Sequence, residues 1–179
     1  MNSMKSRFFS VLALCLLIST TGFAQNKKAV NLDEQIKLNG KVRTGKLANG
    51  LTYYVRANNK PANRAEFQIA VNAGSVLEEA NEQGLAHFTE HMGFNGTKHY
   101  PGNTMIDDLE KEGIVFGREI NAYTGFDQTV YMVTLPTDNA RLFDMGLKIL
   151  DGWASGMLMT GEEIDKERGV IIEEWRMSQ

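Results

Sequence analysis

Cysteine is almost absent from this sequence, with Cys15 as the only one among 179 residues. It lies in an apolar run, residues 8–18, that follows two basic residues and precedes a polar stretch with small residues up to Ala24. This order is typical of a secretory signal peptide, which we predict for residues 1–24. The apolar run is too short to span a bilayer, so a membrane anchor is disfavoured.

Removal of the signal peptide would also remove the cysteine, which excludes several kinds of site from the mature chain. These are a disulfide, a cysteine nucleophile and a zinc site built from thiolates. A transition metal in this chain would therefore have to be held by His, Asp or Glu.

An excess of positive charge is lacking as well. Without residues 1–24 the chain keeps 17 basic and 22 acidic residues, a net charge of −5. This balance argues against a nucleic-acid partner, because such a partner is usually held by a basic face. We expect no membrane span after signal removal, and an exported protein that is periplasmic or otherwise secreted.

The rest of the chain has the composition of a globular domain, with 42% hydrophobic and 23% charged residues overall. Residues 25–40 are polar and predict a leader segment, and residues 41–179 predict the folded domain. The chain ends inside a helical pattern, "ERGVIIEEWRMSQ", without a glycine or proline that would close the helix. We therefore expect this domain to be truncated at its C-terminal end.

Strand patterns occur in three places. Asn49-Gly50 between two strand-like runs predicts a hairpin, and alternating polarity predicts a half-buried strand in residues 65–75. Residues 119–136 again predict strands, with Tyr131, Val133 and Leu135 on one face.

Helical patterns fill the intervals between the strands, over residues 82–94, 103–113 and 138–158. A last helix is expected to follow Thr160, where Glu163 would complete a capping box. Strands and helices without regular alternation predict an α+β fold, in which helices pack on one face of an antiparallel sheet.

The segment "HFTEH" is the strongest sign of chemistry. On a helix, His87, Glu90 and His91 occupy positions i, i+3 and i+4 and project from the same face. Two neutral imidazoles four residues apart can bind one Zn²⁺, and a carboxylate beside them can act as a general base. The third histidine, His99, lies in a loop rich in glycine and proline and is expected to have an ordinary surface role.

A catalytic zinc site needs a third protein ligand, and a carboxylate of the last helix is the natural candidate. Glu167 and Glu174 are seven residues apart and share a helix face. Val170 and Ile171 between them suggest that this face points towards the core, where a carboxylate requires a partner. The residues alone leave both carboxylates open as the ligand.

Residues 44–176 resemble the pitrilysin/insulinase family of zinc metallopeptidases, and in particular its large exported bacterial branch. The phrases that carry the resemblance occur in the expected order: "LANGLTYYV", "NAGSVLEE", "GLAHFTEHMGFNGTKHYPG", "INAYTGFDQTVY" and "ERGVIIEEW". His-x-x-Glu-His is the inverted zinc motif of such enzymes.

The resemblance implies one Zn²⁺ per chain, bound by His87, His91 and Glu174. It implies Glu90 as the general base and Glu167 as a supporting residue that assists catalysis. The spacing from His91 to Glu174 is longer than is usual in the family and favours Glu167 as the ligand, whereas the local phrase favours Glu174.

The resemblance also implies a peptide substrate that pairs with the strand carrying Asn121, Ala122 and Tyr123. In the family, two halves close around the substrate, so the distal half of a full-length chain or a second subunit is an expected partner. The implied activity is that of an endopeptidase acting on peptides or unfolded segments. The alternative is a non-catalytic relative with a structural or docking role, although such relatives typically lack parts of the zinc motif that this sequence keeps.

Overall fold

The computed structural model describes residues 31–178. The predicted signal peptide therefore lies outside the described residues, as does the first part of the predicted leader segment. Residues 31–40 are exposed and contain no helix or strand. The boundaries predicted for the signal peptide, the leader and the peptidase domain stay predictions.

The chain divides into two compact units, Met1–Arg56 and Ala57–Gln179. In the first unit, β1 (Val42–Lys46) and β2 (Thr52–Arg56) form an antiparallel hairpin. The amide of Leu51 donates to Asn49 Oδ1 over 3.1 Å, and Gly50 adopts a φ of 93°, which glycine tolerates best. The hairpin predicted at Asn49-Gly50 is confirmed.

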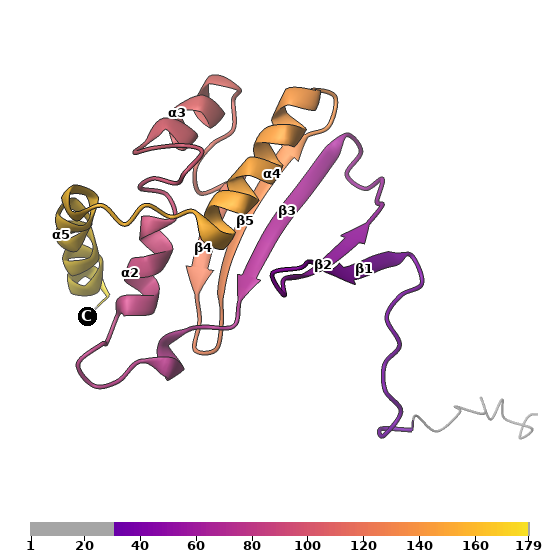
Figure 1. The fold of residues 1–179 in the computed structure, drawn as a ribbon, viewed down its shortest axis with the longest axis horizontal. Coiled ribbons are helices and arrows are strands. Elements are labelled where there is room, and N and C mark those ends of the chain that lie inside the picture. Colours follow the sequence, from indigo (N-terminus) through magenta and orange to yellow (C-terminus); the bar gives the residue numbers. More distant parts are fainter. Residues whose placement is uncertain (1–30, 179) are drawn as a thin grey trace, which may run out of the picture. The chain divides into compact units, whose positions relative to one another are not determined.

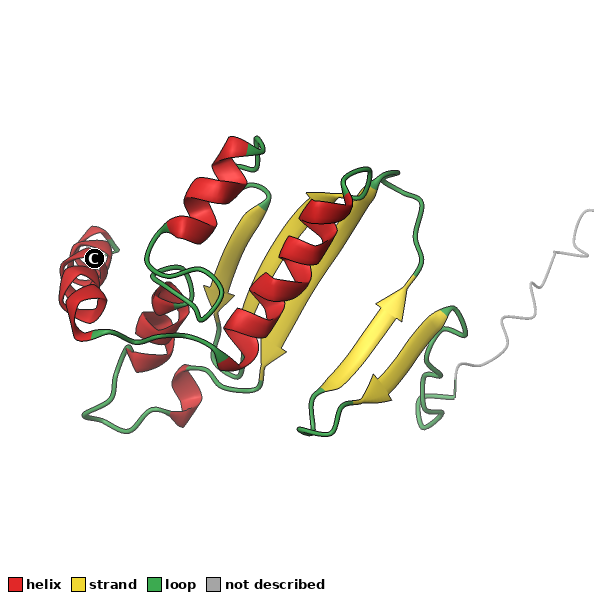
Figure 2. Ribbon diagram, turned by 45° about the horizontal axis from the view of Figure 1, so that its top comes forward, coloured by secondary structure: helices red, strands yellow, loops and turns green. Residues whose placement is uncertain are grey.

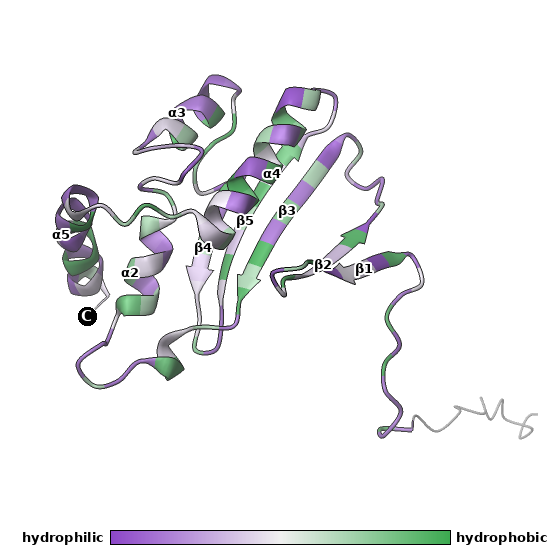
Figure 3. Cartoon of the chain, viewed as in Figure 1, coloured by the Kyte–Doolittle hydropathy of each residue, from purple (hydrophilic) through white to green (hydrophobic). Residues whose placement is uncertain are grey.

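The second unit is built on a three-stranded antiparallel sheet with the order β3-β5-β4. The strands are β3 (Arg64–Val71), β4 (Ile120–Thr124) and β5 (Thr129–Pro136). Hydrophobic and hydrophilic residues alternate along β3 (Figure 3), and Phe67 is its most deeply buried side chain. The long strand β5 lies in the centre, where it pairs with β3 on one side and β4 on the other, and most of its residues are buried.

Helices cover the face of the sheet that carries Phe67 and Tyr131. Two helices, α2 (Leu85–Met92) and α4 (Ala140–Ser155), pack on the strands, and α3 (Thr104–Lys111) adds Met105 and Leu109 to the same buried cluster. The last helix, α5 (Gly161–Met177), packs against α2 instead, and the short 3₁₀ helix η1 (Ser75–Leu77) precedes α2. The helix α4 runs along the strands of this sheet (Figures 1 and 2), and Phe143 packs edge-on against Phe67. The prediction of an α+β fold with helices packed on an antiparallel sheet is confirmed.

Tyr131 joins two of the helices to the sheet. Its ring stacks on Trp153 of α4 with centroids 5.3 Å apart, and its hydroxyl donates to the backbone oxygen of Thr89 in α2 over 3.3 Å. Burial raises the pKa of Tyr131, so the hydroxyl stays protonated and available as a donor. The helix that carries the HFTEH motif is therefore fixed to the central strand.

Helix limits differ from the sequence predictions by two or three residues. α2 begins at Leu85 because Gly84 has a φ of 90°, outside the helical region. α4 ends at Ser155, with Gly156 as its C-cap. Among the described residues, no helix has the length and apolar character required to cross a bilayer.

The capping box predicted at the start of α5 is wrong. Thr160 is the N-cap of α5, but its side chain makes no capping hydrogen bond. The Glu163 carboxylate bonds to the Lys166 ammonium over 2.9 Å. An opposite charge on the next turn is a stronger partner for a carboxylate than a backbone amide, so the capping box does not form.

Candidate metal centre

The centre begins with α2, which brings the three motif residues to one side. The start of this helix is capped from a distance, since the Glu78 carboxylate accepts from the amides of Gly84 and Ala86 over 2.9 and 2.8 Å. A negative charge at this end stabilises the helix. The spacing of His87, Glu90 and His91 then places the side chains as predicted from the motif.

Two histidines and one carboxylate meet at a single point. The Nε2 atoms of His87 and His91 are 3.1 Å apart, and Glu174 Oε2 lies 3.6 Å from the first and 3.5 Å from the second. Within residues 31–178 these three residues form a group able to hold a metal ion. Tetrahedral zinc with bonds of about 2.0–2.1 Å separates its ligand atoms by roughly 3.3 Å, so the triangle fits such an ion.

Glu167 occupies a different position from Glu174. Its Oε1 lies 2.7 Å from His91 Nδ1, the ring nitrogen that faces away from the triangle, and its Oε2 accepts from the side-chain amide of Asn95. The residue is only 9% exposed. The geometry therefore separates the two carboxylates, with Glu174 beside the Nε2 atoms and Glu167 behind His91.

The predicted surroundings of these carboxylates are partly wrong. Val170 is 46% exposed, and the buried hydrophobic cluster around the sheet contains no residue of α5. The face that carries Glu167 and Glu174 lies against α2 and its histidines instead. The carboxylate of Glu167 finds its partners there, in His91 and Asn95.

Glu90 is held beside the triangle and is 7% exposed. Its Oε2 accepts a hydrogen bond of 2.6 Å from the Thr124 hydroxyl at the end of β4. Thr129, paired with Thr124 across the two strands, donates its own proton to the backbone oxygen of Ala73 over 2.9 Å. The proton of Thr124 is directed to Glu90 because Glu90 Oε2 is the nearer acceptor, at 2.6 Å against 3.4 Å for the Thr129 hydroxyl oxygen.

A cavity of about 390 Å³ opens at this centre. Its lining residues come from α2, β4 and α5, from the turn after α2 and from the loop before β4: Glu90, His91, Phe94, Asn95, Phe116, Asn121, Glu167, Val170 and Glu174. Asn121 thus shares the cavity with three of the predicted carboxylates. Ala122 and Tyr123 lie on the same strand but do not line it, and Tyr123 is half-exposed.

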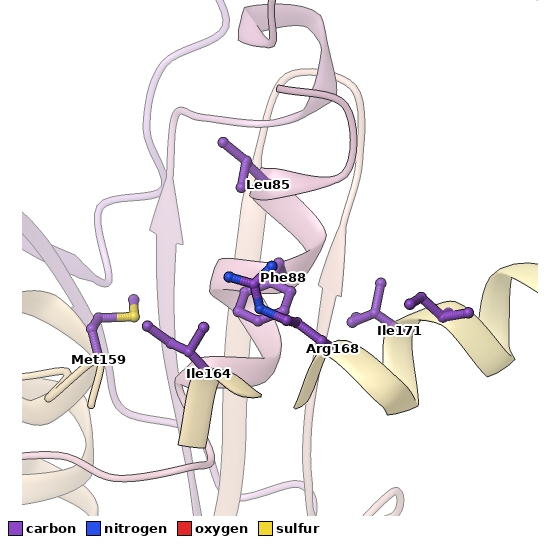
Figure 4. Close-up of a pocket in the computed structure, with 7 residues that line it drawn as sticks. Leu85, Phe88, Met159, Ile164, Arg168 and Ile171 are labelled. Atoms are coloured by element: carbon purple, nitrogen blue, oxygen red, sulfur yellow. The ribbon is translucent and has the colours of Figure 1, made fainter. Parts of the chain in front are cut away.

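A second hollow, of about 450 Å³, is apolar and contains none of the predicted site residues (Figure 4). Its lining comes from α2, α5 and the residues before α5: Leu85, Phe88, Met159, Ile164, Arg168, Ile171 and Ile172. These side chains lie where α2 and α5 pack together. This packing determines which residues of α5 lie beside the histidines of α2.

His99 takes no part in the centre. Its Nε2 lies 2.6 Å from Asp151 Oδ2, which Lys98 also approaches to within 2.8 Å. The hydrogen bond from His99, together with Lys98, holds the pKa of Asp151 below its usual range. This arrangement is in keeping with the surface role expected from the sequence.

Residues 53–179 match the model of the family described as insulinase, peptidase family M16. The chain belongs to this family. It is 45% identical to the probable zinc protease PqqL of Escherichia coli (strain K12), over 78% of this chain and 15% of PqqL. It is 38% identical to the probable zinc protease PqqL of Haemophilus influenzae, over 92% of this chain and 18% of that protein.

Solved structures agree with this assignment. The first half of the periplasmic protease PqqL from Escherichia coli superimposes with a TM-score of 0.76 and 43% identity, over 80% of this chain and 31% of that one. The whole PqqL protease gives a TM-score of 0.74 over 79% of this chain and 16% of that one. The chain spans less than a fifth of the length of the PqqL relatives.

Two partners of the centre were missed in the sequence. Asn95 lies one turn beyond His91, and following the helix register past the motif would have placed it on the same side. Thr124 ends the phrase "NAYT", but nothing in a single sequence indicates that its hydroxyl reaches a carboxylate 34 residues earlier.

Proposed function

We propose that this chain carries the metal centre of a zinc-dependent endopeptidase. The observation that carries the proposal is the triangle of His87, His91 and Glu174, with the buried carboxylate of Glu90 in the lining of the same cavity. Membership of a peptidase family and the naming of relatives as zinc proteases support the general activity.

His87 and His91 would bind Zn²⁺ through Nε2, and Glu174 through Oε2. A zinc ion bound there would act as a Lewis acid that lowers the pKa of a water molecule and polarises a carbonyl. Glu167 would keep the His91 ring in place from the opposite side, as carboxylates behind metal-binding histidines commonly do.

Glu90 would act as the general base. Its Oε2 is occupied by the Thr124 hydroxyl, and within residues 31–178 no protein group bonds to its Oε1. Oε1 would accept a proton from the attacking water and deliver it to the leaving amine. A metal site with a purely structural role has no use for a carboxylate placed beside the metal as a base. The presence of Glu90 therefore favours an enzyme over a non-catalytic docking relative.

The substrate would be a peptide or an unfolded segment. In the described sheet β4 pairs with β5 on one side only, and Asn121 of β4 lines the cavity of the centre. A peptide could add to this strand through main-chain hydrogen bonds, with Asn121, Ala122 and Tyr123 as the binding residues. Such pairing selects an extended backbone rather than a particular sequence.

The remaining part of a longer protein would complete the enzyme. One solved relative is described as the first half of a periplasmic protease, and this chain covers 31% of it. A distal half, or a second subunit, would enclose the peptide and contribute further binding residues. We also propose a periplasmic location, because the solved relative is periplasmic and the sequence predicts a signal peptide.

Glu90→Gln tests the proposal directly. We expect the variant to retain one zinc per chain by elemental analysis and to lose cleavage of an unstructured peptide, by at least about 100-fold. The assay is best made in the full-length protein, and Glu173→Gln, at an exposed position of α5, serves as the matched control. Unchanged cleavage by Glu90→Gln would contradict the mechanism, and a parent protein without zinc would contradict the metal centre.

A further inference from the structure

The Glu167 carboxylate is bound at both of its oxygens. Oε1 lies 2.7 Å from His91 Nδ1, and Oε2 accepts from Asn95 Nδ2. An ionised carboxylate only accepts hydrogen bonds, so both partners must donate. The amide of Asn95 therefore points its NH₂ group at Glu167, and His91 carries a proton on Nδ1.

This direction of donation determines the state of the proposed ligand. A neutral imidazole protonated on Nδ1 has its lone pair on Nε2. Nε2 of His91 is the atom that lies 3.1 Å from His87 Nε2 and 3.5 Å from Glu174 Oε2. The correct tautomer for binding a metal is thus set by Glu167, on the far side of the ring.

Asn95 is well placed to hold Glu167 in this orientation. Its backbone amide donates to the Met92 oxygen over 3.2 Å, which continues the last turn of α2 and places the residue one turn after His91. The two groups that bind Glu167 therefore come from the last turn of α2 and from the turn that directly follows it. A terminal carboxylate rotates easily when only one oxygen is fixed, since its last torsion is broad.

We propose that Asn95 is a positioning residue of the metal centre, which orients Glu167 and through it fixes the tautomer and direction of His91. The proposal rests on the proposed function in one respect, that His91 is a ligand. Asn95 lines the cavity but is not one of the three candidate ligands, so its effect on the metal would be transmitted through Glu167.

The test combines two measurements on the purified protein. Ring ¹⁵N correlation spectra of the metal-free protein, at a pH where His91 is neutral, report its tautomer. Competition with a chromophoric chelator gives the zinc dissociation constant. The variants are Asn95→Asp, which turns the donor into an acceptor facing Glu167, and Asn95→Ala, which removes the amide without adding charge. Asn103→Asp is the matched control, because Asn103 is exposed and its side chain makes no capping bond.

We expect the parent protein and Asn103→Asp to show His91 protonated on Nδ1. Both Asn95 variants should show a mixture of tautomers and bind zinc about 10- to 100-fold more weakly, as is typical when the partner of a metal-binding histidine is disturbed. The double variant Glu167→Gln with Asn95→Asp should bind zinc within about 2-fold of the Glu167→Gln single variant. In the double variant the side-chain amide introduced at position 167 can donate to the carboxylate introduced at position 95.

Two outcomes would overturn the proposal. One is an unchanged tautomer and zinc affinity in both Asn95 variants. The other is an equal loss of affinity with and without Glu167, which would mean that Asn95 acts independently of it. The tautomer is measured without metal, so a parent protein that failed to bind zinc would refute the proposed function while the spectra still decided the role of Asn95.

Discussion

At the scale of single residues, three carboxylates with the same chemistry have separate positions around one pair of histidines. Glu174 faces the Nε2 atoms, Glu167 faces His91 Nδ1, and Glu90 faces Thr124. A side chain's role at this centre is therefore decided by which atom it meets. The two α5 carboxylates should respond differently to substitution for that reason.

Glu174→Ala should bind zinc at least about 1,000-fold more weakly, because it removes one of the three proposed ligands. Glu167→Gln should weaken zinc binding by only about 10- to 100-fold, because it alters the support of a ligand. Zinc dissociation constants measured by chelator competition separate the two cases. The reverse order would make Glu167 the ligand, as the spacing along the sequence suggested.

Thr124→Val should lower kcat for peptide hydrolysis by roughly 10- to 100-fold and leave KM and zinc content unchanged. The substitution keeps the shape of the side chain but removes the hydroxyl that holds Glu90 Oε2, and small displacements of a catalytic group have effects of this size. Thr124→Ser retains the hydroxyl and should recover most of the activity. A rise in KM alone would indicate that Thr124 serves substrate binding through β4.

At the scale of elements, the position of α4 depends on its close packing against the sheet. Gly146 of α4 lies so close to β3 that a Cβ atom there would be 2.6 Å from the Phe67 ring. The glycine is needed for this contact and not for an unusual backbone angle. It lets the helix approach the strand as closely as the core requires.

Gly146→Ala should lower the free energy of unfolding by about 1–2 kcal/mol, because the overpacking exceeds the gain in helix propensity. Gly169→Ala is the control, since that glycine is exposed in the middle of α5 with no atom near its would-be Cβ. It should raise the free energy of unfolding by up to about 1 kcal/mol. Urea denaturation of both variants measures the difference, and stabilisation by Gly146→Ala would show that the Phe67 ring moves freely.

At the scale of the whole molecule, the proposed metal centre would join two helices that are far apart in the sequence. The proposed ligands come from α2 and α5, and those helices otherwise meet through the apolar side chains around the second hollow. A metal ion that binds only the folded state adds stability in proportion to the logarithm of its affinity. A metal ion bound between α2 and α5 should therefore slow hydrogen exchange in α5.

Zinc at about 1,000 times its dissociation constant should stabilise the folded protein by about 4 kcal/mol. Hydrogen exchange should slow most in α5 and the end of α2, and less in the pairing of β3 with β5. Removal of the metal with a chelator should reverse both effects, and Glu174→Ala should show neither. Equal protection throughout the chain would argue against a specific link between the two helices.

The sequence by itself determined the family, the α+β class and the common face of His87, Glu90 and His91. The common face follows from local periodicity, since a helix brings positions i, i+3 and i+4 together wherever it lies. Strand alternation likewise identified Phe67 and Tyr131 as core residues.

Only the tertiary structure gave Glu167 and Glu174 different positions, with Glu174 beside the Nε2 atoms and Glu167 behind His91. The two residues lie two turns apart on the same face of α5, so helical periodicity cannot distinguish them. The packing of α5 on α2 determines which one reaches the Nε2 atoms. The same packing brings Asn95 to Glu167, and the pairing of β4 with β5 brings Thr124 to Glu90. Contacts between distant segments depend on how whole elements are placed, which periodicity within one element does not encode.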